Sequence, residues 1–244
     1  MPGRIIPLIN DEIYHVFNRG VSFQPTFFDQ RDYQRLLSTI IYYQNQKPPM
    51  KLSRFLTLSQ EERSRIMEEQ KKKINFLIDI VCYCFMPNHL HFLLKQKAEK
   101  GISKFMGNIA NSYARFVNTK QERTGPLFQG RFKAVRIEDN EQLIHVSRYI
   151  HLNPLTSYIV KSAGELEDYI YSSFPEYLGK IQNGFCQKEI ILTQFKTRDD
   201  YKQSFQPQSG YKKFVLDQAD YQKRLGDIKH LILEEKKKRW RNFR

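Results

Sequence analysis

Two histidines stand two residues apart in "FMPNHLHFLL", a run that is otherwise apolar and rich in strand-forming residues. Side chains alternate across a strand, so His89 and His91 are expected to project from one face while Leu90 and Phe92 point into the other. Two imidazoles at that separation can hold one divalent ion, so the pair is a candidate half of a metal site. The alternative is one core histidine and one surface histidine.

The two cysteines just before the histidines raise a second metal hypothesis, a tetrahedral zinc site that Cys82 and Cys84 would complete. Structural zinc sites usually hold their cysteines two to four residues apart, with a long gap before the histidines, so the spacing argues against zinc. With Cys186 the cysteines are odd in number, and thiols in an apolar strand commonly act as small hydrophobes. We expect no disulfide, which fits a reducing compartment.

The candidate nucleophile is Tyr113, which belongs to the clearest amphipathic pattern in the chain. That stripe comprises Ile102, Phe105, Met106, Ile109, Ala110, Tyr113, Phe116 and Val117. One hypothesis is that Tyr113 is an ordinary core aromatic. The other is that the stripe covers the histidine face, so that a metal favours the phenolate of a group whose ordinary pKa is about 10.

Positive charge is the strongest feature of the composition: 40 Lys and Arg against 26 Asp and Glu leave a formal charge of +14. Such an excess predicts a polyanionic partner, and nucleic acid is the first to consider. Around Tyr113 the cations interleave with Phe116, Phe128 and Phe132, and rings with cations are typical of single-strand binding. The candidate DNA-binding cations there are Arg115, Lys120, Arg123, Arg131, Lys133 and Arg136.

The C-terminal segment "KKKRWRNFR" is a second candidate DNA contact, the alternative being a solvated, disordered end. Its candidate residues are Lys236, Lys237, Lys238, Arg239, Trp240 and Arg241.

These residues require elements to position them, and periodicity predicts strand, helix, hairpin, helix, strand and helix in that order. The last helix, "NEQLIHVSRYIHLNP", is expected to have Asn140 at its N-cap and Pro154 just past its end. This order predicts an α+β, ferredoxin or RRM-like sandwich with a central, largely antiparallel sheet and helices on its faces.

We expect one main domain over residues 1–180, with a helical insertion near 46–73, followed by a helical extension and basic tail over 181–244. No apolar run is long enough to span a bilayer, and no signal peptide or lipidation motif is present. We therefore expect a cytoplasmic protein with no membrane partner.

Several ordered motifs together resemble a known family: "MPNHLHFLL", "NSYARFVN", "GPLFQGRFKAV", and "RYIHLNPLTSYIV" followed by "DYIYSS". They are similar to the single-tyrosine HUH transposases (IS200-like), in particular the REP-associated tyrosine transposases. The resemblance covers roughly residues 4–180 and continues loosely into "ILTQFKTRDDYKQSF". It implies an RRM-like fold, a divalent metal (Mg²⁺ or Mn²⁺), and cleavage and rejoining of single-stranded DNA at hairpin-flanked ends.

Carried over to this sequence, the resemblance implies that His89 and His91 are metal ligands and that Tyr113 forms a 5′-phosphotyrosine. Relatives supply a further ligand about one turn beyond the tyrosine, where this chain has Phe116 and Val117. Asn118 is then the candidate ligand, although five residues along a helix place it about 140° round from the tyrosine.

Water or His15 is the alternative to Asn118 as the further ligand. Arg131 is the candidate phosphate contact. Arg148, His151 and Asn153, in "RYIHLNP", are interpreted as family framework or as helix-end packing.

The leading functional hypothesis is a metal-dependent transposase or endonuclease acting on single-stranded hairpin DNA. One alternative is a domesticated hairpin-binding protein with reduced catalysis, and another is a relaxase or replication-initiator type of HUH nuclease. The resemblance also implies a possible homodimer and a bacterial, nucleoid-associated location.

Overall fold

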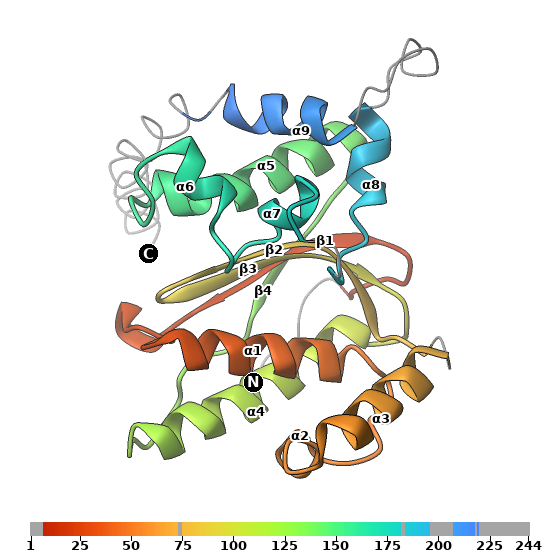
Figure 1. Cartoon of the computed structure of the whole chain (residues 1–244), viewed down its shortest axis with the longest axis vertical. Helices are drawn as coiled ribbons and strands as arrows, with labels where there is room; N and C mark the ends of the chain where they lie inside the picture. The colour runs from red at the N-terminus through yellow and green to blue at the C-terminus, as the bar shows by residue number, and fades with distance from the viewer. Residues whose placement is uncertain (1–6, 73–74, 182–183, 196–206, 218, 220–244) are drawn as a thin grey trace, which may run out of the picture.

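The computed structural model describes residues 7–72, 75–181, 184–195, 207–217 and 219. One open sheet lies at its centre with the strand order β2-β3-β1-β4, and every neighbouring pair is antiparallel (Figure 1). The strands are β1 (Ile13–Arg19), β2 (Ile78–Met86), β3 (His89–Gln96) and β4 (Lys133–Arg136). The predicted α+β class and antiparallel sheet are confirmed, and helices cover both faces of the sheet.

The hairpin that carries the two histidines is buried because both of its faces are covered. In β2, eight of the nine residues are buried, which explains its nearly continuous apolar sequence. The register places His91 opposite Cys84 on one side and opposite Phe17 on the other. Alternation then assigns the histidines to the face of Cys84 and Leu93, whereas Leu90 and Phe92 belong to the other face, as predicted.

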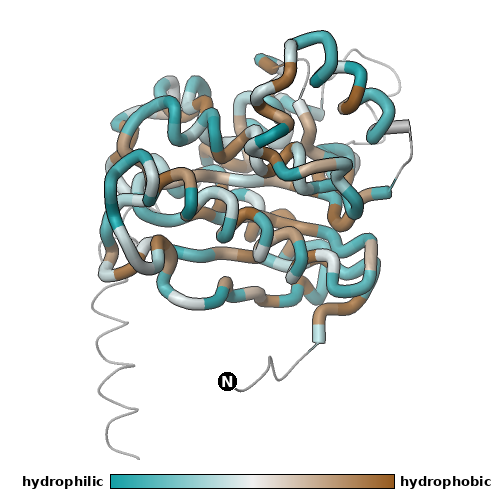
Figure 2. Tube along the Cα trace, turned by 90° about the horizontal axis from the view of Figure 1, so that it is seen from below, coloured by the Kyte–Doolittle hydropathy of each residue, from teal (hydrophilic) through white to brown (hydrophobic). Residues whose placement is uncertain are grey.

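The lower face of the sheet packs on α1 (Gln30–Tyr43) and α4 (Gly101–Lys120) (Figure 1). The stripe predicted between residues 102 and 117 does form the buried side of α4, where Ile102, Phe105 and Ile109 meet Phe92 and the rest of this core. Seen from below, the tube changes between hydrophobic and hydrophilic residues within single helices, as expected of helices with one buried side (Figure 2).

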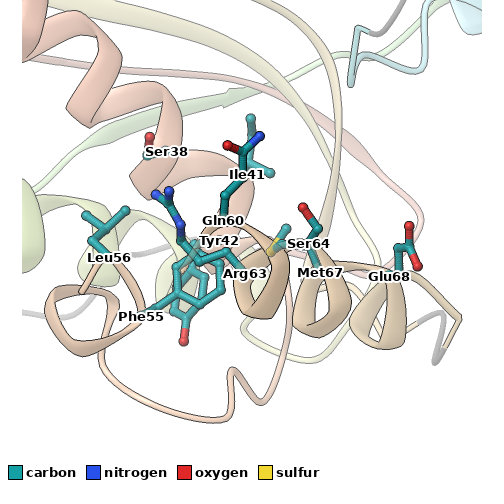
Figure 3. Close-up of a pocket in the computed structure, with 10 residues that line it drawn as sticks. All are labelled: Ser38, Ile41, Tyr42, Phe55, Leu56, Gln60, Arg63, Ser64, Met67 and Glu68. Carbon is teal, nitrogen blue, oxygen red and sulfur yellow. The ribbon is translucent and has the colours of Figure 1, made fainter. Parts of the chain in front are cut away.

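The insertion expected near residues 46–73 contains α2 (Leu52–Phe55) and α3 (Gln60–Lys72). Ser59 begins α3 with a reciprocal cap: its hydroxyl accepts from the Glu62 amide at 3.2 Å, and its own amide donates to the Glu62 carboxylate at 2.9 Å. The insertion packs against the end of α1, where the rings of Tyr42 and Phe55 are 4.7 Å apart (Figure 3).

The upper face of the sheet is covered by α5 (Asn140–Thr156), which packs mainly on β2 and β3. The remaining upper elements are α6 (Ala163–Glu167), α7 (Phe174–Tyr177), α8 (Glu189–Leu192) and α9 (Pro207–Leu216), and two short 3-10 turns lie at Val21–Phe23 and Thr193–Phe195. The described part of the expected extension, including Ile191 and Tyr211, joins the same core as α5.

Both predicted ends of α5 need correction. The N-cap is Asp139, not Asn140, because the Asp139 carboxylate accepts from the Gln142 amide at 2.7 Å. Pro154 lies inside the last turn of the helix, not past its end, and Thr156 is the last helical residue.

A buried polar cluster joins α5 to α9. The two ring nitrogens of His151 contact the Tyr211 hydroxyl at 2.7 Å and the Ser173 hydroxyl at 2.8 Å, and Tyr211 also donates to Ser147 at 3.0 Å. Burial lowers the pKa of His151 to about 3, so the imidazole is neutral and satisfied by hydroxyl partners.

The three cysteines, Cys82, Cys84 and Cys186, are free thiols, as expected from the sequence. Among the described residues, no helix combines the length and the apolar character that crossing a membrane requires.

Candidate active site

The two histidines open into a cavity of about 290 Å³ at the end of β3. Its walls come from β1, the loop that follows β1, the β2–β3 turn and α5. They comprise Phe17, Asn18, Arg19, Phe23, Asn88, His89, His91 and Tyr149. The imidazole rings of His89 and His91 have centroids 5.0 Å apart and stand at 86° to each other, so the two side chains converge from one face as predicted.

Each imidazole is oriented through its Nδ1 atom by a neighbouring polar side chain. His91 Nδ1 lies 2.9 Å from His15 Nε2, and His89 Nδ1 lies 2.6 Å from the Asn88 side-chain oxygen. Metal-binding histidines are commonly held in this way, so that the ring presents Nε2 to the ion. His15, considered from the sequence as a further ligand, instead lies behind His91 as the partner that orients it.

Burial and a neighbouring charge keep His89 in the neutral form. Burial, together with the positive charge of Arg19, lowers the pKa of His89 to about 4. The imidazole is therefore neutral at physiological pH, which is the form that binds metal.

Helix α5 contributes two further polar residues to the histidines. The Tyr149 ring lies 5.7 Å from the His91 ring and 6.0 Å from the His15 ring, centroid to centroid. Asn153 lies four residues further, one helical turn, and its side chain hydrogen-bonds to His89. Two imidazoles and an amide oxygen are donors that fit a divalent ion, with substrate oxygens or water completing its shell.

Within the described residues, no group of three or more His, Cys, Asp or Glu side chains is gathered closely enough to hold a metal. A zinc site made by Cys82 and Cys84 is therefore not formed. Both thiols are completely buried in the core against β3, where burial raises their pKa values well above the ordinary range.

Tyr113 lies on the opposite side of the sheet from the histidines, which corrects the prediction that its helix covers the histidine face. Its ring is fully buried in the core of α1 and α4, and its hydroxyl donates to the Thr26 carbonyl at 2.8 Å. Burial raises the pKa of Tyr113 far above 10, so the phenolate is strongly disfavoured there. The geometry is that of a core tyrosine, the alternative left open by the sequence.

Asn118 is also remote from the histidines, because it lies on α4 on the other face of the sheet. Its side-chain amide donates to the Gly125 carbonyl at 2.8 Å and so ties the end of α4 to the following loop. This placement corrects the expectation of a metal-ligand role for Asn118.

The predicted DNA-binding cations fall into two groups. Three are engaged within the protein: Lys120 contacts Asp29 and Asp32 at 2.7 Å each, Arg136 contacts Glu12 at 2.7 Å, and Arg123 donates to the Pro126 carbonyl at 3.3 Å.

The other three lie at open surfaces. Lys133 is opposite Phe17 in the sheet and therefore on the histidine face, whereas Arg131 and Arg115 line cavities on the α4 side. The tail residues 236–241 lie outside the described residues.

Sequence reasoning missed Tyr149 as a site residue and assigned its segment to framework. The available signal was the spacing of Tyr149 and Asn153, because it supplies a polar residue one turn beyond a tyrosine, which the segment after Tyr113 lacks.

Comparison with known proteins agrees with the motifs. Residues 50–153 match the family model described as "Transposase IS200 like", a segment that includes both histidines and Tyr149. The recognition made from the motifs is therefore confirmed as a resemblance, and this segment is similar to the IS200-like transposases.

The fold is also found in a solved structure. A solved structure described as a REP-associated tyrosine transposase bound to a REP hairpin shares 15% sequence identity with this chain and superposes with a TM-score of 0.53. The match covers 74% of this chain and 87% of that one. No curated protein matches the chain significantly.

Proposed function

We propose that this protein is a metal-dependent transposase that cleaves and rejoins single-stranded DNA beside hairpins, with Tyr149 as its nucleophile in place of Tyr113. The observation that carries the proposal is the shared cavity of His89, His91 and Tyr149. The IS200-like family match and the fold of a hairpin-bound transposase support DNA transposition and a hairpin substrate.

The proposed reaction is a transesterification that leaves the number of phosphodiester bonds unchanged. The Tyr149 oxygen attacks phosphorus, a 5′-phosphotyrosine bond forms, and the bond from phosphorus to the 3′ oxygen breaks. The phenol proton is lost to water, and the departing 3′ oxygen takes up a proton. Attack by another 3′-hydroxyl reverses these changes, so rejoining needs no ATP.

The polar side chains at and around the two histidines have separate parts in this reaction. His89, His91 and Asn153 would hold Mg²⁺ or Mn²⁺, which when bound supplies Lewis-acid activation of the scissile phosphate. His15 and Asn88 keep the imidazoles oriented. Arg19 pairs with His89 in the sheet and lines the same cavity, so it can provide positive charge for the phosphate and the developing phenolate.

A covalent-capture experiment tests the proposal. Purified protein is incubated with labelled hairpins taken from the DNA that flanks its gene, each with single-stranded arms, in Mn²⁺ or Mg²⁺, and the products are separated on a denaturing gel. We expect a protein–DNA adduct that disappears with EDTA and in Tyr149→Phe, but persists in Tyr113→Phe. An adduct that survives in Tyr149→Phe and is lost in Tyr113→Phe would refute the choice of nucleophile.

Tight hairpin binding without an adduct under either metal would support the alternative of a DNA-binding protein with reduced catalysis. Assembly as a homodimer stays a prediction, which sedimentation of the protein with and without hairpin DNA will check.

A further inference from the structure

An exposed aromatic ring stands at the rim of the histidine cavity. Phe23 lies in the turn after β1, lines the cavity with His89 and His91, and keeps 65% of its surface exposed. An exposed ring of this size beside a reactive site is unusual for a residue with only a structural role, because burying it would be favourable.

The backbone of this turn is held in a costly conformation. Ser22 and Phe23 have φ angles of 52° and 60°, in the left-handed region that non-glycine residues rarely adopt. Gly20 allows the chain to close, since a Cβ there would meet the Gln24 carbonyl oxygen at 2.1 Å. Two further bonds fix the turn from outside: Gly20 donates to the Asn88 carbonyl at 2.7 Å, and Val21 donates to the Leu127 carbonyl at 3.0 Å.

Asn88 couples the turn directly to the histidine site. Its side-chain amide donates to the Phe23 carbonyl at 3.1 Å, and its side-chain oxygen lies 2.6 Å from His89 Nδ1. One residue thus fixes both the backbone of Phe23 and the orientation of a proposed metal ligand. The backbone that carries the ring is therefore held in a defined position relative to His89.

Arg19 places a positive charge beside the Phe23 ring. Its guanidinium lies 4.6 Å from the centroid of the Phe23 ring, in cation–π contact. An aromatic face combined with a guanidinium is suited to an unstacked nucleobase and its adjoining phosphate, because stacking accepts the base and the cation accepts the backbone. A phosphate alone would not require the ring, and a purely apolar partner would not favour the guanidinium.

We infer that Phe23 and Arg19 form a stacking platform for one unstacked base of single-stranded DNA, next to the phosphodiester that is cleaved. The inference rests on the proposed function and deepens it, because it assigns a subsite to the strand outside the hairpin. Phe23 is a binding residue on this view, and it takes no part in the transfer of the phosphoryl group.

Affinity measurements with modified DNA test the platform. Binding of a labelled hairpin with single-stranded arms is measured in EDTA, so that no strand is cut, using a series of arms that each carry one abasic position. For the wild-type protein, one abasic position should lower affinity about tenfold, the range expected for one base stacked on one aromatic ring.

The variants make this a double-mutant cycle. Phe23→Ala should lower affinity for the intact arm about tenfold and should lose sensitivity to that abasic position, whereas Phe23→Trp should keep both properties. Phe28→Ala is the matched control, because Phe28 is also exposed, at 49%, but does not line the cavity. Circular dichroism and thermal melting will show that each variant is folded.

Equal affinities and equal abasic profiles for the wild type and Phe23→Ala would overturn the inference. So would a loss of self-association in Phe23→Ala without a change in DNA affinity, since the ring would then face a second copy of the chain. If the covalent adduct forms but DNA affinity does not depend on Phe23, the stacking platform is refuted and the proposed cleavage reaction stands. If DNA affinity depends on Phe23 but no adduct forms, the cleavage reaction is refuted and the stacking platform stands.

Discussion

Tyr113 and Tyr149 are both carried by long helices that pack on the same sheet, yet their surroundings are opposite. Tyr113 is sealed in the core below the sheet, and its hydroxyl is bonded to a backbone carbonyl. Tyr149 is half-buried above the sheet, beside two histidine rings. Apolar residues at helical spacing mark the buried side of a helix. A tyrosine within such a stripe is therefore more often part of the core than a reactive group.

The largest contrast between the two tyrosines is expected in stability. Tyr113→Ala empties a fully buried site and leaves the Thr26 carbonyl without this donor, so it should lower the free energy of unfolding by about 3–5 kcal/mol. Tyr149→Ala should cost less than about 1.5 kcal/mol, because the side chain is only half-buried. Urea unfolding followed by circular dichroism measures both values, and equal costs would remove the distinction.

The second contrast concerns the two asparagines, Asn153 above the sheet and Asn118 below it. Asn153→Ala should weaken metal binding and reduce adduct formation at limiting Mn²⁺ about 10–100-fold, with recovery at higher Mn²⁺. Asn118→Ala is the matched control and should leave the metal dependence unchanged, since its amide bonds the Gly125 carbonyl. Titration of adduct yield against Mn²⁺ concentration decides this, and identical curves for Asn153→Ala and the wild type would exclude Asn153 as a ligand.

The smallest contrast is between two lysines that the sequence could not distinguish. Lys133→Met should weaken DNA binding modestly and reduce the slope of log affinity against log salt by about 1, because Lys133 lies on the histidine face. Lys120→Met should leave that slope unchanged, because its ammonium is held by Asp29 and Asp32. Salt titrations of hairpin binding measure both slopes, and a change of slope in Lys120→Met alone would reverse the assignment.

Lys120→Met should instead affect stability. Asp32 is fully buried and would lose its cation, at a cost of about 1–3 kcal/mol. Arg136→Met serves as the comparison, because its partner Glu12 is partly exposed and the pair should contribute less than about 1 kcal/mol.

The elements themselves could be predicted because each has a strong local pattern. The stripe of α4, the apolar run of β2 and the capping residues of α3 all depend on neighbours within a few residues, and the main strands and helices follow the predicted order. The face of the sheet that carries the two histidines was also predictable, since alternation along a strand is fixed by backbone geometry.

The pairing of helices with sheet faces could not be read in the same way. The stripe of α4 is equally compatible with the face of Phe92 and with the face of His91, because either offers an apolar surface. Which face it takes depends on the chain path after β3, and no local pattern encodes that path. Helix α5 packs on the sheet and on α9 together, so it has buried residues on most of its sides and its apolar periodicity is weak. Tyr149 was overlooked because this weak pattern does not show which side of α5 faces the histidines.

The buried contact between His151 and Tyr211 has a mechanical consequence. His151 lies on α5 between Tyr149 and Asn153, and Tyr211 belongs to α9, so the helix that bears the proposed nucleophile is clasped from its outer side by the chain's extension. Damage to that clasp would change no side chain of the cavity, but it would let α5 shift and move Tyr149 relative to the two histidines. Such an enzyme would retain all its catalytic groups but would lose activity because its tyrosine and its histidines would no longer be aligned.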